Sequence, residues 1–255
     1  MQVLISDCSK FNETFPIAFK YNVGIEIQEF TSPDYIDNYG YLANKFREKV
    51  KALSMCGFHG PFSELIPASR DKKIKEISLN RFQTAYELAV SVGAHHFNLH
   101  TGYIPKTYTD DEWLKASVEF WTKFLEDKDD SMIFHLENVY EKDFSLTIKL
   151  FDKVNEKLGK ERLAACLDIG HANSNSSISI KEWIEGLNKR IRYVHLHNNN
   201  GILDDHWGLW KGKIDVENVL ELLVKYSPYS DWMIEAKFPD LEQSVVWMKK
   251  KGFLK

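Results

Sequence analysis

Six apolar stretches of this 255-residue chain each end in a side chain that can bind a metal ion or transfer a proton. The terminal residues are His59, His100, Glu137, Asp168, His197 and Glu235. Successive members lie 41, 37, 31, 29 and 38 residues apart, which is the length of a strand, a helix and two loops. Imidazole and carboxylate groups together suit Zn²⁺ or Mn²⁺, and no cysteine occupies these positions. The repetition predicts a metal centre with ligands from successive strands.

The segment at 163–173 shows the pattern most clearly. Residues 163–167 have the continuous apolar character of a strand buried on both faces, and Asp168 and His171 follow its carboxyl end. We expect Gly170 to let the backbone turn where the strand stops. Taken alone, Asp168 could equally cap a helix, with His171 incidental. The recurrence of the pattern along the chain favours a shared metal site.

The rest of the chain alternates between strand-like and helix-like periodicity. Strands are predicted at 3–6, 24–30, 53–58, 97–100, 132–138, 163–167, 192–197 and 232–235, and helices at 35–51, 69–92, 110–125, 144–158, 178–187, 216–226 and 240–250. We therefore predict an α/β fold, a single (β/α)₈ TIM barrel over residues 1–255, whose strands all open on one face. A doubly wound open sheet is the alternative. It would group ligands near one reversal of strand order rather than on six successive strands.

Composition limits the possible partners. A formal charge of −4 and a pI near 6.2 argue against a nucleic-acid partner, although a local basic patch could be hidden in such an average. Three separated cysteines, without a Cys-x-x-Cys pair, indicate reduced thiols and a cytoplasmic protein. No apolar run approaches the roughly 18 residues of a membrane span, and the amino terminus lacks a secretion signal. We therefore expect no membrane partner.

The predicted loop at 198–215 adds further candidates. Asp204 and His206 form an Asp-x-His pair, and Trp207 and Trp210 lie among glycines. This composition suits a lid that supplies ligands and covers a substrate. The alternative is a loop whose tryptophans pack on the barrel rim.

Two further histidines, His135 and His195, each lie two residues before a proposed ligand. We interpret them as core residues or as partners that support ligands.

An ordered series of motifs runs through the chain: His-Gly-Pro-Phe at 59–62, Leu-His-Thr-Gly at 99–102, Leu-Glu-Asn at 136–138, Leu-Asp-Ile-Gly-His at 167–171, His-Leu-His-Asn at 195–198, Asp204-x-His206 followed by Gly212, and Ile-Glu at 234–235. With these motifs the chain resembles the xylose-isomerase-like barrels. That group unites sugar isomerases and epimerases with the endonuclease IV class of apurinic endonucleases. The resemblance covers nearly the whole chain.

The resemblance implies two alternative ligand patterns. The ketose-epimerase pattern implies one metal ion on Glu137, Asp168, His197 and Glu235. The endonuclease pattern implies two further ions, one on His59 and His100 sharing Glu137, and one on His171, Asp204 and His206. Zn²⁺ is the expected ion and Mn²⁺ the alternative. One departure is Leu203, which occupies the position where ketose 3-epimerases carry an arginine that contacts substrate.

The activity that the resemblance implies is a metal-dependent sugar or sugar-phosphate isomerase or epimerase acting through an enediolate. Glu137 and Glu235 would move the proton, and His171 would act beside them by positioning hydroxyls, as would His206. Expected substrate contacts are Phe62, His195, Trp207 and Trp210. The partner is then a small sugar, with the oligomeric state left open. The alternatives are a zinc phosphodiesterase acting at abasic DNA and a barrel that binds metal or sugar without turnover.

Overall fold

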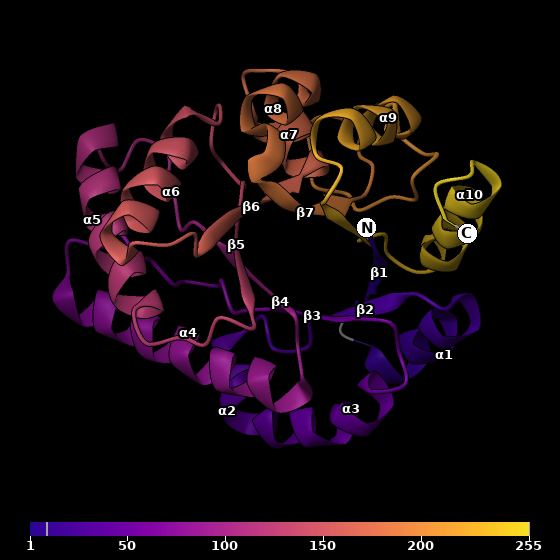
Figure 1. Cartoon of the computed structure of the whole chain (residues 1–255), viewed down its shortest axis with the longest axis horizontal. Coiled ribbons are helices and arrows are strands. Elements are labelled where there is room, and N and C mark those ends of the chain that lie inside the picture. Colours follow the sequence, from indigo (N-terminus) through magenta and orange to yellow (C-terminus); the bar gives the residue numbers. More distant parts are fainter. Residues whose placement is uncertain (9, 255) are drawn as a thin grey trace.

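Eight parallel strands close into a barrel in chain order in the computed structural model, which describes residues 1–8 and 10–254 (Figure 1). The strands are β1 (Val3–Ser6), β2 (Gly24–Ile27), β3 (Cys56–His59), β4 (His96–His100), β5 (Ile133–Glu137), β6 (Leu163–Asp168), β7 (Ile191–Leu196) and β8 (Asp231–Ile234). The predicted (β/α)₈ barrel is confirmed.

The helices surround the outside of this barrel (Figure 1). They are α1 (Phe11–Tyr21), α2 (Pro33–Tyr39), η1 (Gly40–Leu42), α3 (Ala43–Val50), α4 (Lys72–Val92), α5 (Asp110–Leu125), α6 (Ser145–Leu158), α7 (Ile169–Asn175), α8 (Ile180–Leu187), η2 (Asn188–Arg190), α9 (Val216–Tyr226) and α10 (Asp240–Lys250). Within the described residues, no helix is both long enough and apolar enough to cross a membrane.

The largest differences between the predicted and the observed helices occur in three places. The helix predicted at 35–51 is divided into α2, the 3₁₀ turn η1 and α3. Helix α1 was missed, and it carries Pro16 in its interior, a residue that normally argues against a helix. Helix α7 was also missed because its seven residues are rich in glycine, asparagine and serine, which are weak helix formers.

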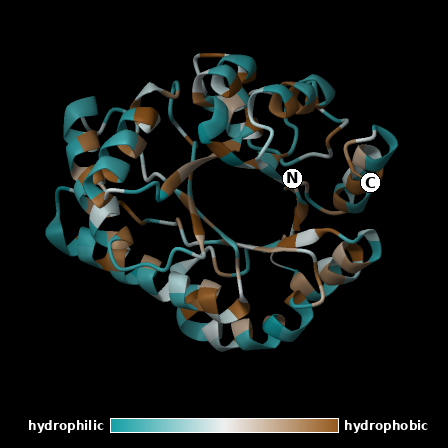
Figure 2. Cartoon of the chain, in the orientation of Figure 1, coloured by the Kyte–Doolittle hydropathy of each residue, from teal (hydrophilic) through white to brown (hydrophobic). Residues whose placement is uncertain are grey.

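Apolar side chains form a core on both sides of the barrel wall. Figure 2 shows hydrophobic colour along the strands and on helix surfaces that face them, with hydrophilic colour over much of the outside. A separate small group, Leu4, Cys166, Tyr193 and Met233, is buried together on β1, β6, β7 and β8. The barrel is therefore a packed core rather than a pore, and polar groups at its carboxyl end rest on a fixed base.

Strand register sets which functional residues are neighbours. His100 on β4 pairs with Glu137 on β5, and Asp168 on β6 pairs with His195 on β7. The last paired residues of β7 and β8, Leu196 and Ile234, immediately precede His197 and Glu235. The ends of successive strands thus bring residues remote in sequence to one rim, as the sequence predicted.

Candidate metal centre

The nine proposed ligands converge at the carboxyl ends of the strands. Seven of them line a cavity of about 690 Å³: His59, His100, Glu137, His171, Asp204, His206 and Glu235. The other two, Asp168 and His197, are fully buried. Both contact members of the lining set. The nine residues that were predicted to lie together at one end of the barrel therefore do lie together in the structure.

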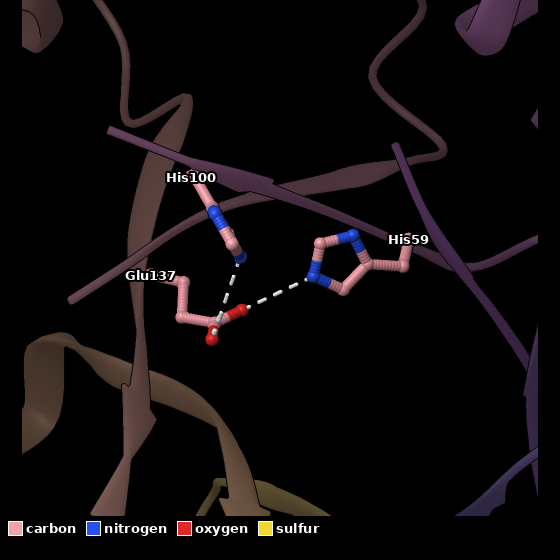
Figure 3. A group of neighbouring side chains, drawn as sticks. All are labelled: His59, His100 and Glu137. Atoms are coloured by element: carbon pink, nitrogen blue, oxygen red, sulfur yellow. Dashed lines mark hydrogen bonds and ion pairs between the residues drawn. The ribbon is translucent and has the colours of Figure 1, made fainter. Parts of the chain in front are cut away.

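Glu137, at the end of β5, connects two histidines from the preceding strands (Figure 3). His59 Nε2 lies 3.3 Å from its Oε2, and His100 Nε2 lies 3.8 Å from its Oε1. The Asn98 amide also donates a hydrogen bond to Oε2. The other ring nitrogen of His59 is 2.8 Å from the carbonyl oxygen of Gly60, which fixes the orientation of the ring. The donor atoms of His59, His100 and Glu137 all lie within 4.8 Å of one another.

Asp168 has two roles in the same place. It is the N-cap of α7, and its Oδ1 accepts the His171 backbone N–H at 2.6 Å. This cap holds the first turn of α7 at the end of β6 and places His171 Nδ1 3.1 Å from Glu137 Oε1. His197 Nε2 lies 3.2 Å from the same Asp168 oxygen. The helix-cap and metal-ligand interpretations of Asp168 are thus compatible.

The expectation that Gly170 forms a turn is wrong. Gly170 lies within α7, without a positive φ. A Cβ at this position would be only 1.9 Å from Cε1 of His197. Glycine is needed here because the imidazole of His197 packs directly against the helix backbone.

Asp204 and His206 bring the loop after β7 into the site. His206 Nε2 lies 2.8 Å from Asp204 Oδ2, and the same oxygen is 3.4 Å from His171 Nε2. The His206 ring stacks on that of His197, with centroids 4.0 Å apart. Donor atoms of His197, His206 and Glu235 lie within 4.8 Å of one another. His206 therefore lies with the proposed ligands that follow β7 and β8, as well as with Asp204.

The four donors of the epimerase pattern do not form a separate set among these groups. Glu137 belongs with His59 and His100, and also with Asp168 and His171. The arrangement is a continuous arc of overlapping donor groups. The number of ions it binds stays a prediction.

Histidines supply the positive charge in this arc. In the described part of the chain, no lysine or arginine forms an ion pair with its carboxylates. Burial disfavours a charged His206, but Glu235 and Asp204 raise its pKa to about 9. Burial opposes protonation of His171 too, yet Asp168, Asp204 and the neighbouring glutamate raise its pKa well above the usual value. The surrounding carboxylates thus favour positive charge in this cluster, whether it is carried by protonated histidines or by a bound cation.

The donor set fits a divalent cation. Burial lowers the pKa of His100 to about 3, so its ring is neutral and able to bind a metal. Burial opposes ionisation of Glu137, but His195 helps to hold its pKa well below the usual range. A bound cation would replace the charge that protonated histidines carry and would release their protons. Mixed nitrogen and oxygen donors suit Zn²⁺ or Mn²⁺, and the identity of the ion remains a prediction.

A buried polar group behind the carboxylates was largely missed. His195 Nδ1 lies 3.1 Å from Glu235 Oε2 and 3.4 Å from Glu137 Oε2. Its Nε2 lies 3.4 Å from Glu26 Oε2, and Gln28 donates to both Glu26 (3.1 Å) and Glu235 (2.5 Å). The available signal was a glutamate between two isoleucines in a predicted strand. In a closed barrel that side chain has no solvent to face and must point to the interior.

The predicted substrate contacts divide into two kinds. Phe62 lines the cavity and stacks on His100 with centroids 4.3 Å apart. His195 is fully buried and outside the cavity lining, so a supporting role fits and direct substrate contact does not. Trp207 and Trp210 also lie outside that lining. Trp207 pairs its backbone with Asn198 of the same loop, and Trp210 is 40% exposed.

The strands and helices of this protein form a TIM barrel. Histidines and carboxylates at the strand ends form a candidate metal site. The family described as xylose isomerase-like TIM barrel matches residues 22–251, and the chain belongs to this family.

Similar proteins extend the comparison. The chain is 28% identical to the uncharacterized protein MJ1311 of Methanocaldococcus jannaschii over 65% of its length, and 27% identical to MJ1614 of the same organism over 66%. The matches span 58% and 65% of those two proteins. The TTHB071 protein from Thermus thermophilus, soaked with ZnCl₂, is 21% identical with a TM-score of 0.76, covering 99% of this chain and 98% of that one. D-psicose 3-epimerase from Clostridium cellulolyticum H10, with D-tagatose, is 13% identical with a TM-score of 0.78, covering 100% and 99%. The two solved structures therefore share the fold of this chain.

Proposed function

We propose that this protein is a divalent-metal-dependent isomerase or epimerase that acts on a sugar or sugar phosphate by proton transfer through an enediolate. The observation that supports it is that Glu137, at the end of β5, and Glu235, just after β8, both line the cavity. Both also approach one nitrogen of His195, at 3.4 and 3.1 Å. The family and the shared fold of a D-psicose 3-epimerase with D-tagatose support a sugar as substrate.

The two glutamates would move the proton. One carboxylate removes a proton from the carbon beside the substrate carbonyl, and the C–H electron pair becomes part of a C=C bond while negative charge moves to oxygen. The pKa of each glutamate is lowered in this site, so the other carboxylate must first take up a proton from water. It would then return this proton to the opposite face of that carbon or to the neighbouring carbon. The first outcome is epimerisation. The second is isomerisation, which also requires the hydroxyl proton on the first carbon to move to the former carbonyl oxygen, so that the first carbon becomes the new carbonyl. His171 and His206, which line the cavity, would hydrogen-bond to substrate hydroxyls.

Glu137, Asp168, His197 and Glu235 are the residues that would hold the ion of this reaction. A divalent cation there would stabilise the negative charge that develops on oxygen. His195 and Gln28 keep Glu235 oriented, since each contacts a different oxygen of its carboxylate.

The substrate contact made by an arginine in ketose 3-epimerases must be replaced here. Leu203 occupies that position, is 61% exposed and lies outside the cavity lining. Among described residues that line the cavity, Lys237 is the only lysine or arginine. The sugar specificity is therefore expected to differ from that of those enzymes.

A substrate screen tests the proposal. Metal-stripped protein and protein reconstituted with Zn²⁺ or Mn²⁺ would be incubated with ketoses, aldoses and their phosphates, and products separated by chromatography. We expect metal-dependent interconversion of at least one pair. No interconversion by protein with confirmed metal content would contradict the proposal.

The second candidate is metal-assisted hydrolysis of a phosphodiester at abasic DNA. It is favoured by one observation, the His59–His100–Glu137 donor group, which the epimerase pattern does not require. The formal charge of −4 argues against it. Three tightly held zinc ions together with cleavage of an abasic oligonucleotide would favour this activity over isomerisation. Metal or sugar binding without either reaction would leave the non-catalytic alternative.

A further inference from the structure

The cavity has two chemically different walls. The histidines and carboxylates of the candidate metal centre form one of them. The loops after β3, β4 and β5 form the other, whose large apolar side chains are Phe62, Leu65, Ile66, Tyr103, Ile104 and Tyr140. Phe62, Ile104 and Tyr140 remain 39%, 37% and 50% exposed. Exposed apolar groups gathered in a cavity are typical of a ligand contact.

Contacts between the loops hold this apolar wall in place. Gly102 packs so closely on Pro67 that a Cβ there would be 2.4 Å from Pro67 Cδ. The Thr101 hydroxyl donates to the buried carboxylate of Glu141, whose other oxygen accepts the Val139 N–H at 2.7 Å. The three loops are thus connected to one another. Because the loop backbones are already held together, binding a ligand would require less ordering of this wall.

The cavity is larger than a free monosaccharide requires. A hexose has about twelve non-hydrogen atoms, and the roughly 30 Å³ occupied by a water molecule in the liquid is an upper limit for each of them. Such a sugar would fill at most about half of the 690 Å³ cavity. The remaining space lies beside the apolar loops if the sugar hydroxyls face the metal-centre wall.

Charge disfavours a phosphate as the group that fills this space. Glu64 lines the cavity from the same loop as Phe62. Lys237 comes from the segment after β8 instead. A phosphate that lay against the apolar loops would be repelled by the Glu64 carboxylate, and no lysine or arginine in the described residues of those loops lines the cavity to balance its charge. A neutral ring would instead pack on Phe62 and Tyr140.

We propose that the site takes a sugar carrying a neutral, apolar, ring-sized substituent. The hydroxyl and carbonyl groups of the sugar lie at the metal-centre wall, and the substituent lies against Phe62, Ile104 and Tyr140. For the sugar part of the ligand, this inference rests on the proposed function.

Calorimetric titration of the full, metal-reconstituted chain tests the substituent directly. The probes are 6-O-phenyl-D-glucose, 6-O-methyl-D-glucose and glucose 6-phosphate, which all keep a free anomeric carbon and differ only in the group on O6. Because the phenyl ring buries apolar surface, we expect it to bind about tenfold more tightly than the methyl compound. Phe62→Ala and Tyr140→Ala should remove most of that difference, whereas Tyr140→Phe should keep it. Phe19→Ala, at a 62% exposed position on α1, is the matched control and should change nothing.

Three results would overturn the inference: equal affinity for the phenyl and methyl compounds, tightest binding of glucose 6-phosphate, or no binding of the phenyl compound at millimolar concentration. Loss of the phenyl preference with metal-dependent sugar turnover intact would refute this inference alone. A phenyl preference that persists while no sugar is turned over would refute the proposed reaction alone.

Discussion

At the scale of single residues, Glu137 is the side chain on which the site depends most. It contacts four histidines: His59, His100, His171 and His195. No other carboxylate in the described residues has so many imidazole partners. Its loss should therefore affect both the chemistry and the binding of metal.

Glu137→Gln and Glu235→Gln should each lower turnover by about 10²–10⁴-fold, since a glutamine cannot take up or return the proton. The measurement is kcat on a sugar found by the screen, beside the metal content of each variant. Glu221→Gln, at an exposed position of α9, is the control and should retain turnover. Full turnover in both site variants would show that these glutamates do not carry the proton.

Metal affinity should rise with pH through the neutral range. The pKa of His206 is raised to about 9, so its ring is protonated at neutral pH; because it stacks on His197, its positive charge opposes a cation there until the proton is lost. The protonated form competes with metal at low pH, and this competition disappears as pH approaches 9. Titration calorimetry in buffers of different ionisation enthalpy should detect proton release at pH 7. Identical heats in all buffers would contradict this prediction.

At the scale of elements, the contact between α7 and the end of β7 controls the position of one proposed ligand, His197. Helix α7 begins at the Asp168 cap, and its second residue, Gly170, leaves room for the His197 imidazole. The strand end and the helix start therefore position the ligand jointly.

Gly170→Ala should weaken metal binding by about 10–100-fold, because the added Cβ would displace the His197 ring. Alanine suits a helix, so circular dichroism should stay unchanged. Gly40→Ala is the matched control, since its Cβ would meet only Leu88 side-chain atoms at 3.7 and 3.8 Å. Metal content after dialysis is the readout. Equal metal retention in both variants would show that His197 does not bind the ion.

At the scale of the whole molecule, metal binding should stabilise the fold. A ligand at one hundred times its dissociation constant adds about 2.7 kcal/mol to the free energy of unfolding, which raises Tm by roughly 5–10 °C for a chain of this size. Calorimetric scans with Zn²⁺, Mn²⁺ and a chelator would measure the shift. We propose that residues 1–255 are one domain, so a single transition is expected. No shift with either ion would contradict metal binding, and two separated transitions would contradict the single domain.

The main architecture could be predicted because periodicity and residue type are local properties of the chain. Helices α9 and α10 have the predicted bounds, and every strand lies where an apolar run was found. Local rules were insufficient for α1, where Pro16 is accommodated inside a helix, and for α7, whose seven residues depend on the Asp168 cap.

By itself, the sequence determined the order of strands and helices, the types of donor at the strand ends and their meeting on one face, since parallel strands of a barrel share a direction. Only the tertiary structure decided which donors are neighbours. Strand register and side-chain direction group His206 with His197, and they bury His195 between two glutamates. They also leave Trp207 and Trp210 outside the cavity lining. These distances depend on how elements far apart in sequence pack together, which no local pattern records.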